Sequence, residues 1–373
     1  MKFLEAVLIL SGMIIGVGMF GIPFSFFKAG FWLGTFELAV LGGVMVLIHL
    51  LYARIIIETP SAHRLPGYVR LHLGGQAEIL ATLASFFGIT GSLLAYILVG
   101  SIFLHNIFQN FWGGSSEFLW AAAITASGAL ITRFTLKKEA LVNGILTAVL
   151  IGFLGYMIFL LFPQVQSEHF VGVNLKEFFL PYGVLLFALS GSAAIPNLVG
   201  LLSRDREKIS RAVIIGTLVP AVIYFFFALA VVGATGSSTS EEALAGLKGL
   251  VGGGVMLVAS LTGFLAVFTS YIILNSNAQA LLELDFRFPQ KIAWILSSLI
   301  PFVLYLVGVQ NFILIIGAVG AVAGGIEIGL IIAAYHRIRK NKGQEFSWFS
   351  YFWKAAIFLM VGAGVVYELL RVL

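Results

Sequence analysis

The sequence predicts an all-α integral membrane protein of eleven membrane-spanning helices, the first ten forming two five-helix repeats of opposite orientation. Three observations predict it: the composition, eleven apolar segments, and two interrupted segments at matching positions. Of the 373 residues, 60% are hydrophobic and 10% are charged, with a mean hydropathy of +1.04. Soluble domains carry about 25% charged residues. A chain this apolar cannot cover its surface in water, so lipid must be its solvent.

The apolar segments give the number of spans. A membrane-spanning helix needs about 20 mainly apolar residues. Eleven segments meet this need, at 5–27, 31–57, 79–110, 117–135, 141–162, 181–202, 211–233, 252–282, 289–307, 311–338 and 351–371. Short connections between them leave no separate soluble domain. We expect a core over 1–338, with repeats at about 5–162 and 181–338, followed by a cytoplasmic loop and an eleventh helix over 339–373.

The basic residues predict the orientation of these spans. Loops on one side of the predicted topology carry 18 Lys and Arg residues and loops on the other carry 4, which together make the 22 of the chain. Since Lys and Arg are enriched in cytoplasmic loops, we expect a multi-pass protein of the plasma (inner) membrane, with a cytoplasmic N-terminus and an extracytoplasmic C-terminus. The net charge of +5 then reflects topology and not a nucleic-acid partner. The inner set is Lys2, Arg54, Arg64, Arg70, Arg133, Lys137, Lys138, Arg204, Arg206, Lys208, Arg211, Arg287, Lys291, Arg337, Arg339, Lys340, Lys342 and Lys354, and the outer set is Lys28, Lys176, Lys248 and Arg371.

Two spans contain sequences that interrupt a helix. The first span reads Gly-Met-Ile-Ile-Gly-Val-Gly-Met-Phe-Gly-Ile-Pro over 12–23, and the sixth reads Phe-Ala-Leu-Ser-Gly-Ser-Ala-Ala-Ile-Pro-Asn over 187–197. Glycine lowers the cost of leaving the helix, and proline removes a hydrogen-bond donor. Each run opens a group of five helices, so the two groups are related as inverted copies. The alternative is that these glycines only allow tight packing or a proline kink.

Interrupted helices at corresponding positions of two repeats predict a transporter site. Unwinding exposes backbone groups inside the membrane, where an unpaired group costs several kcal/mol. Amides at the start of a half-helix suit a carboxylate, and freed carbonyls suit an ammonium group or a small cation. A zwitterion satisfies both, so an amino acid fits this chemistry better than a sugar or a lipid.

At these residues the sequence resembles the amino acid/auxin permease family of the amino acid–polyamine–organocation superfamily, and within it the bacterial tyrosine/tryptophan permeases. The resemblance covers nearly the whole chain: the first Gly-rich run, the Ser-Gly-Ser-Ala-Ala-Ile-Pro run, the charged loop over 203–208, and the eleven spans. It implies a LeuT-like fold. It also implies that the amides of Val17 and Gly18 hold the substrate carboxylate. The carbonyls of Ile14, Phe187 and Ala188, with the hydroxyl or carbonyl of Ser190, would hold the ammonium. The implied substrate-binding residues are Ile14, Gly16, Val17, Gly18, Phe187, Ala188, Ser190, Gly191 and Thr262.

The resemblance also implies one sodium site. Ala266, Thr269 and Ser270 match the Ala-x-x-Thr-Ser pattern of LeuT-type transporters, and the carbonyls of Gly12 and Ile15 would complete a five-oxygen cage. The alternative is that both hydroxyls bond back to carbonyls of their own helix. A second sodium site is not expected, because Met19 and Ala188 stand where some relatives place polar ligands. Some proton-coupled relatives carry a lysine in the fifth span that replaces the sodium ion. The corresponding span here, 141–162, has no lysine.

The sequence therefore predicts a secondary active transporter that carries a neutral, hydrophobic or aromatic L-amino acid with sodium by alternating access, working as a monomer. Small residues at 191–193 leave room for a bulky side chain, and no intramembrane Asp or Lys is available to pair with a charged one. One alternative is proton-coupled symport through Glu327 or Glu37, since ionisable residues within spans are usually functional. A second is a non-transporting amino acid sensor in the membrane.

Several other classes are excluded by the sequence. The chain carries neither a phosphate-binding P-loop nor an H-E-x-x-H pattern, so neither ATP-driven transport nor an intramembrane metalloprotease is expected. It has no cysteine, which excludes disulfides and thiolate metal sites. We expect no cofactor besides the coupling ion, and no enzymatic activity.

Overall fold

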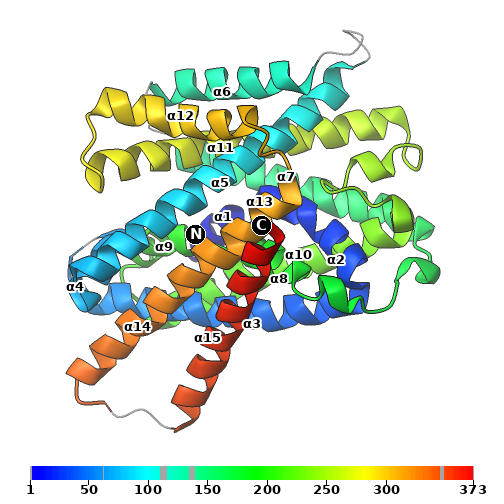
Figure 1. The fold of residues 1–373 in the computed structure, drawn as a ribbon. Helices are drawn as coiled ribbons and strands as arrows, with labels where there is room; N and C mark the ends of the chain where they lie inside the picture. The colour runs from blue at the N-terminus through cyan, green and yellow to red at the C-terminus, as the bar shows by residue number, and fades with distance from the viewer. Residues whose placement is uncertain (1, 62, 110–115, 134–138, 345–347, 373) are drawn as a thin grey trace.

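The computed structural model describes residues 2–61, 63–109, 116–133, 139–344 and 348–372. Over these residues the chain is helical throughout, and the one β contact is an isolated bridge between Lys248 and Val251. Figure 1 shows long helices crossing at shallow and steep angles, with the α14 and α15 pair projecting from one side. The all-helical prediction is confirmed.

Four long unbroken helices match predicted spans within a few residues at each end. Their apolar character supplies the lipid-facing surface, because a helix satisfies all of its own backbone hydrogen bonds in hydrocarbon. They are α3 (Phe31–Glu58), α5 (Gly75–Phe108), α10 (Arg206–Thr235) and α11 (Gly253–Leu284).

The first and sixth predicted spans are both interrupted. The first consists of α1 (Lys2–Ile14), a 3₁₀ turn η1 (Val17–Gly21) and α2 (Ile22–Ala29), with a bend of 51°. The sixth consists of α8 (Leu180–Ala188), η5 (Ser192–Ala194) and α9 (Ile195–Leu201). In each span the Ile-Pro pair opens the second half-helix. A proline lacks the N–H that would be unpaired in a first turn anyway, so this is where it is tolerated best.

The tenth span has a feature that the sequence did not predict. It runs as α13 (Phe312–Ala318), a π-helical segment η8 (Val319–Gly324) and α14 (Gly325–Asn341). A π-helical turn widens the backbone spiral and is frequent at functional sites. Glu327 follows this segment directly.

The remaining elements are shorter. The helix α4 (Leu65–Leu73) was not predicted. It fills a loop that was read only for its charge, because its nine residues are too few to give a clear periodic pattern. The other helices are α6 (Glu117–Arg133), α7 (Glu139–Leu161), α12 (Gln290–Leu306) and α15 (Trp348–Val372), and the 3₁₀ turns in the loops are η2 (Phe162–Gln164), η3 (Ser167–His169), η4 (Leu175–Glu177), η6 (Gly236–Ser238) and η7 (Ala245–Leu247).

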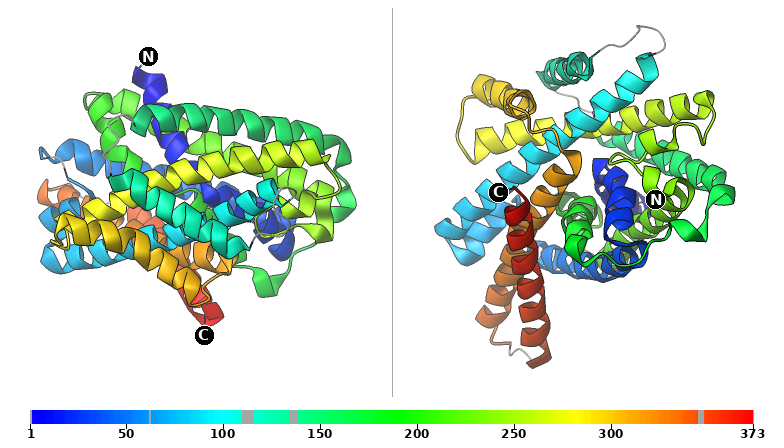
Figure 2. Two further views of the ribbon diagram at one scale, coloured as in Figure 1. Left: turned by 90° about the horizontal axis from the view of Figure 1, so that it is seen from above. Right: turned by 45° about the vertical axis from the view of Figure 1, so that its right-hand side comes forward.

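Helix α15 occupies the place of the predicted eleventh span and runs beside α14 (Figure 2). Its described apolar part covers only 355–368, so its crossing of the membrane stays a prediction. The end of the predicted 117–135 span and the basic residues Lys137 and Lys138 lie outside the described residues.

Glycines allow the interrupted sixth span to pack closely against the tenth. Gly183 on α8 lies against Gly317 on α13 and Gly320 in η8. A Cβ at Gly183 would come within 2.5 Å of the Gly317 carbonyl oxygen, and one at Gly320 would meet the Gly183 carbonyl. Small residues allow such backbone-to-backbone approach between membrane helices. This crossing places the second break beside the start of α14.

Candidate functional site

The two breaks pack directly on one another. A Cβ added at Gly18 would lie 2.9 Å from the Cα of Ala188 and 2.7 Å from the Phe187 ring. A Cβ added at Gly191 would lie 2.7 Å from the Ile14 side chain. Both breaks therefore need glycine, because only a residue without a side chain allows the backbones to approach this closely.

A cavity of about 310 Å³ lies at this meeting point. Its walls come from both breaks and from α5, α11, η8 and α14. The structure brings eight of the nine predicted substrate-binding residues to this wall: Ile14, Gly16, Val17, Gly18, Phe187, Ala188, Ser190 and Gly191. Thr262 does not line it; the α11 residues that do, Leu274, Asn277 and Leu281, lie further along the helix.

The cavity extends to one end of the helix bundle. Arg64, Leu65 and Pro66, which lead into α4, form part of its wall, together with Leu281 near the end of α11. We call this the basic end, because the loops after α3 and α9 place Arg64 and Arg204 there. Toward the other end Phe20 packs edge-on against Phe103 and Phe227, with ring centroids 5.1 and 6.4 Å apart, and all three are buried. The cavity is thus reached from the basic end.

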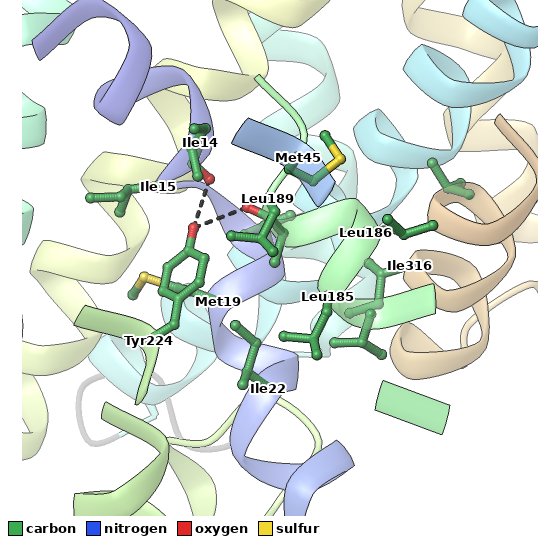
Figure 3. Packing of buried hydrophobic residues seen from close by; sticks show 14 of the residues in the cluster. Ile14, Ile15, Met19, Ile22, Met45, Leu185, Leu186, Leu189, Tyr224 and Ile316 are labelled. Atoms are coloured by element: carbon green, nitrogen blue, oxygen red, sulfur yellow. Dashed lines mark hydrogen bonds between the residues drawn. The ribbon is translucent and has the colours of Figure 1, made fainter. Parts of the chain in front are cut away.

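Tyr224 on α10 reaches both breaks. Its hydroxyl lies 2.8 Å from the carbonyl oxygen of Ile14, to which it donates, and 3.1 Å from that of Ala188. Figure 3 shows this hydroxyl between the ends of the two half-helices, with dashed lines to each. The carbonyl of Phe187 accepts the Ser190 amide at 3.2 Å. All three carbonyls predicted to hold an ammonium group therefore have a donor already, and each keeps a second lone pair.

Tyr96 on α5 covers the first break. Its hydroxyl would lie 2.8 Å from a Cβ at Gly16, and it lies beside the Val17 amide and the Ser270 hydroxyl. Val17 opens the 3₁₀ turn η1, and amides of a first turn have no partner within their own helix. Tyr96 therefore connects a predicted carboxylate-binding amide with a predicted sodium ligand.

None of the five predicted sodium residues lines the cavity. Thr269 donates its hydroxyl hydrogen to the carbonyls of Leu265 and Ala266, at 2.9 and 3.2 Å. These are hydrogen bonds to carbonyls of its own helix, as the alternative interpretation predicts for Thr269. Gly12 and Ile15 lie on or just after α1, which packs mainly on α10, α7 and α9. No contact between Gly12 or Ile15 and Thr269 is shown among the described residues, so the five-oxygen cage stays a prediction.

The two candidate coupling carboxylates lie in different places. Glu327 lines the cavity beside the Ser192 hydroxyl and near Tyr52, and its buried Oε1 has no hydrogen-bond partner. Glu37 does not line the cavity. It lies near Tyr182, and both of its oxygens are buried without a hydrogen-bond partner.

The comparison with known families decides the identity of the chain. Residues 1–370 match the model of the tryptophan/tyrosine permease family. The chain belongs to this family. The resemblance read from the sequence is thereby confirmed, and the protein is an amino acid permease and not an enzyme.

Individual relatives of this permease are distant. A protein described as glutamine transporter 2 of Aliivibrio fischeri is 22% identical over 357 residues, which are 92% of the permease and 91% of that protein. The tyrosine-specific transport system 2 of Haemophilus influenzae is 24% identical over 246 residues, 64% of the permease and 59% of that protein.

Solved structures show the fold of the permease. Mhp1, a nucleobase-cation-symport-1 family transporter with bromovinylhydantoin bound, superposes with a TM-score of 0.67 at 14% identity, covering 98% of the permease and 90% of Mhp1. MhsT in complex with L-phenylalanine superposes with a TM-score of 0.63 at 14% identity, covering 98% of each chain. The predicted LeuT-like fold with broken first and sixth helices is confirmed.

One functional feature of the permease escaped the sequence analysis. Tyr224 is the only tyrosine of α10 and lies in its apolar second half, and a buried tyrosine hydroxyl usually finds a partner. That pattern could have singled it out, but not its two partners, which lie 210 and 36 residues away.

The Asp285 carboxyl, at the end of α11, lies within electrostatic range of Arg64. Burial raises the pKa of the Asp285 carboxyl above its ordinary value, and the charge of Arg64 opposes that shift.

Proposed function

We propose that this permease is a sodium-coupled symporter of neutral L-amino acids with hydrophobic or aromatic side chains, working by alternating access. The observation that carries the proposal is the single cavity where both helix breaks meet. The first break offers the amides of Val17 and Gly18 to a carboxylate. The carbonyls of Ile14, Phe187 and Ala188, with Ser190, offer acceptors to an ammonium group.

The walls of the cavity favour a neutral substrate. Apolar contacts come from Ile14, Leu186 and Val319, and the charged side chains among its described lining are Glu327 and Arg64. A glutamine transporter and a tyrosine-specific transport system among the relatives, and the L-phenylalanine bound to MhsT, agree with this substrate class.

Sodium is the coupling ion that best suits the residues beside the cavity. Sodium is a hard cation and prefers oxygen ligands, which Thr269 and Ser270 provide on α11. A hydroxyl that donates its hydrogen to a carbonyl of its own helix still has lone pairs for a cation. The back-bonding of Thr269 is therefore compatible with ligation. Ala266, Gly12 and Ile15 would add their carbonyl oxygens.

A potential of about 100 mV contributes roughly 2.3 kcal/mol per charge, and each tenfold of accumulation needs about 1.4 kcal/mol. One sodium ion thus drives roughly fifty-fold accumulation of a neutral amino acid before its own gradient is counted.

The basic end is proposed to face the cytoplasm, as the positive-inside rule predicts. The N-terminus is then cytoplasmic, the C-terminus lies outside, and the cavity is open inward. The cluster of Phe20, Phe103 and Phe227 closes the outer side. We propose that the monomer is the working unit, because both breaks belong to one chain.

Uptake into proteoliposomes tests the proposal. Purified protein is given an inward sodium gradient and labelled tyrosine, tryptophan, phenylalanine, leucine or glutamine. We expect sodium-stimulated uptake of at least one. Thr269→Ala and Ser270→Ala are expected to raise the sodium concentration for half-maximal uptake by about tenfold, the loss of a single good ligand contact. Ser260→Ala is the matched control, since this buried hydroxyl on the same helix has no hydrogen-bond partner.

Two other results would decide against sodium symport. If an inward proton gradient drives uptake and Thr269→Ala leaves it unchanged, proton coupling replaces sodium coupling. The Glu327 carboxyl in the cavity, whose Oε1 has no hydrogen-bond partner, is the observation that favours this second candidate. If amino acids raise the melting temperature of the protein but none is taken up under either gradient, the protein binds without transporting.

A further inference from the structure

The carbonyls of Ile14 and Ala188 lie at the C-terminal ends of two half-helices. Ile14 is the last residue of α1 and Ala188 the last of α8, so neither carbonyl has the amide that a continuing helix would supply. Both residues are buried, at 3% and 2% exposure. A carbonyl left unpaired in such surroundings costs several kcal/mol.

Tyr224 supplies a donor to both ends from a third helix. It is fully buried and its hydroxyl lies 2.8 Å from one carbonyl oxygen and 3.1 Å from the other. A tyrosine hydroxyl has one hydrogen, so the two carbonyls share it and neither is saturated. Ile14 and Ala188 line the cavity, whereas Tyr224 stands behind them.

Helix α10 is well placed to fix this hydroxyl. It packs against α1, α2, α3 and α7. Two further buried hydrogen bonds tie it to its neighbours: Ser11 donates to the Gly216 carbonyl at 3.1 Å, and the His49 ring lies 3.0 Å from the Thr217 hydroxyl. The position of the Tyr224 hydroxyl is therefore set by several helices and not by the two breaks alone.

We propose that Tyr224 is a positioning residue for the amino group of the substrate. By bridging the two carbonyls it holds their separation, and by sharing one hydrogen it leaves each an acceptor toward the cavity. An ammonium group bound across the breaks then meets both oxygens. This inference rests on the proposed binding of an amino acid in the cavity.

A cycle of protein and ligand changes tests the inference. The wild-type and Tyr224→Phe proteins are compared for inhibition of uptake by L-phenylalanine and by 3-phenylpropionate, which lacks the amino group. Tyr224→Phe is expected to weaken the amino acid about tenfold, as for the loss of one buried hydrogen bond. It is expected to leave 3-phenylpropionate unchanged, so the ratio between the two ligands falls about tenfold. A purely structural defect would weaken both ligands alike and keep the ratio.

Tyr182→Phe on α8 is the matched control, because the Tyr182 hydroxyl is buried without a hydrogen-bond partner. It should leave the ratio as in the wild type. If 3-phenylpropionate binds too weakly to compete, N-methyl-L-phenylalanine replaces it, since it keeps the charge and loses one N–H donor. If the Tyr224→Phe protein is not recovered folded, the same two ligands are compared on a protein with 4-aminophenylalanine at position 224. This side chain keeps a hydrogen-bond donor but places it at a different distance from the two carbonyls.

An unchanged ratio in a folded variant overturns the inference while the proposed function stands. Failure of the wild-type protein to bind any amino acid overturns the proposed function itself, and the two failures are thereby distinguished.

Discussion

The two breaks share a sequence pattern but differ in geometry and surroundings. In the first, the chain bends by 51° and passes through the extended Gly16 before η1 begins. In the second, α8 and α9 keep within one span of 22 residues, and the chain leaves the helix between Ala188 and Ser192. The first break is covered by the hydroxyl of Tyr96 and the second by the carboxyl of Glu327.

This difference gives the two sides of the cavity opposite electrostatic character. The first break turns first-turn amides toward the cavity, which attract negative charge. The second has the Glu327 carboxyl beside it, which offers oxygen acceptors to a hydrogen-bond donor or a cation. Glycine and proline determine where a helix breaks, whereas the neighbouring helices determine what each break can bind.

The largest effect is expected at the contact between the breaks. In Gly18→Ala the new Cβ would meet backbone at Ala188, which cannot yield as a flexible side chain does. We expect amino acid uptake by folded protein to fall by at least about a hundredfold, a loss of roughly 3 kcal/mol that matches typical overpacking. Gly200→Ala on α9 is the control, since nothing lies within 4 Å of its new Cβ. Near-normal uptake by Gly18→Ala would mean that the breaks need not touch during transport.

A smaller effect is expected at the second break. Glu327→Gln keeps the size of the side chain and removes its charge. Loss of a charge-assisted contact beside Ser192 should raise the KM for the amino acid about tenfold, while sodium still stimulates uptake. Uptake rates over pH 5 to 9 complete the measurement. If the variant loses concentrative uptake and all pH dependence together, Glu327 carries the coupling proton and sodium symport is wrong.

The smallest effect is expected at the first break. Tyr96→Phe removes a neutral hydroxyl beside the Val17 amide and Ser270. A neutral hydrogen bond contributes about 0.5–1.5 kcal/mol, so KM should rise roughly threefold to tenfold. Because the hydroxyl lies beside Ser270 as well, the half-maximal sodium concentration should rise with it. If KM changes while the half-maximal sodium concentration stays constant, Tyr96 acts on the first break and not on the α11 hydroxyls.

The spans and both breaks were predictable from the sequence because lipid imposes simple rules on a chain. About 20 apolar residues must form a helix, and Gly-rich Ile-Pro runs must interrupt one. The backbone groups of the substrate site follow from the breaks, and eight of nine expected residues line the cavity. Thr262 does not line it, because sequence spacing along α11 does not say which turn of that helix reaches the breaks.

Other features depend on contacts that no local pattern contains. The partners of Tyr224 come from helices distant in sequence. The π-helical turn before Glu327 lies in a Gly-rich stretch, and glycines alone do not distinguish a π-helical turn from close packing. Helix α4 was not predicted, because nine residues give too little periodicity.

The glycine crossing between α8 and the tenth span also limits how this sequence can vary. A methyl group at Gly317 would meet the Glu368 carboxyl on α15, whereas Gly183 and Gly320 lie against backbone of the facing span, so a methyl group at either would push the sixth and tenth spans apart. The Glu327 carboxyl and the second break would then separate, since they lie on those two spans. Gly183 and Gly320 are therefore a compact sequence marker: relatives that keep both glycines are expected to keep the same cavity wall, and relatives that lose one should show a compensating change at the facing position.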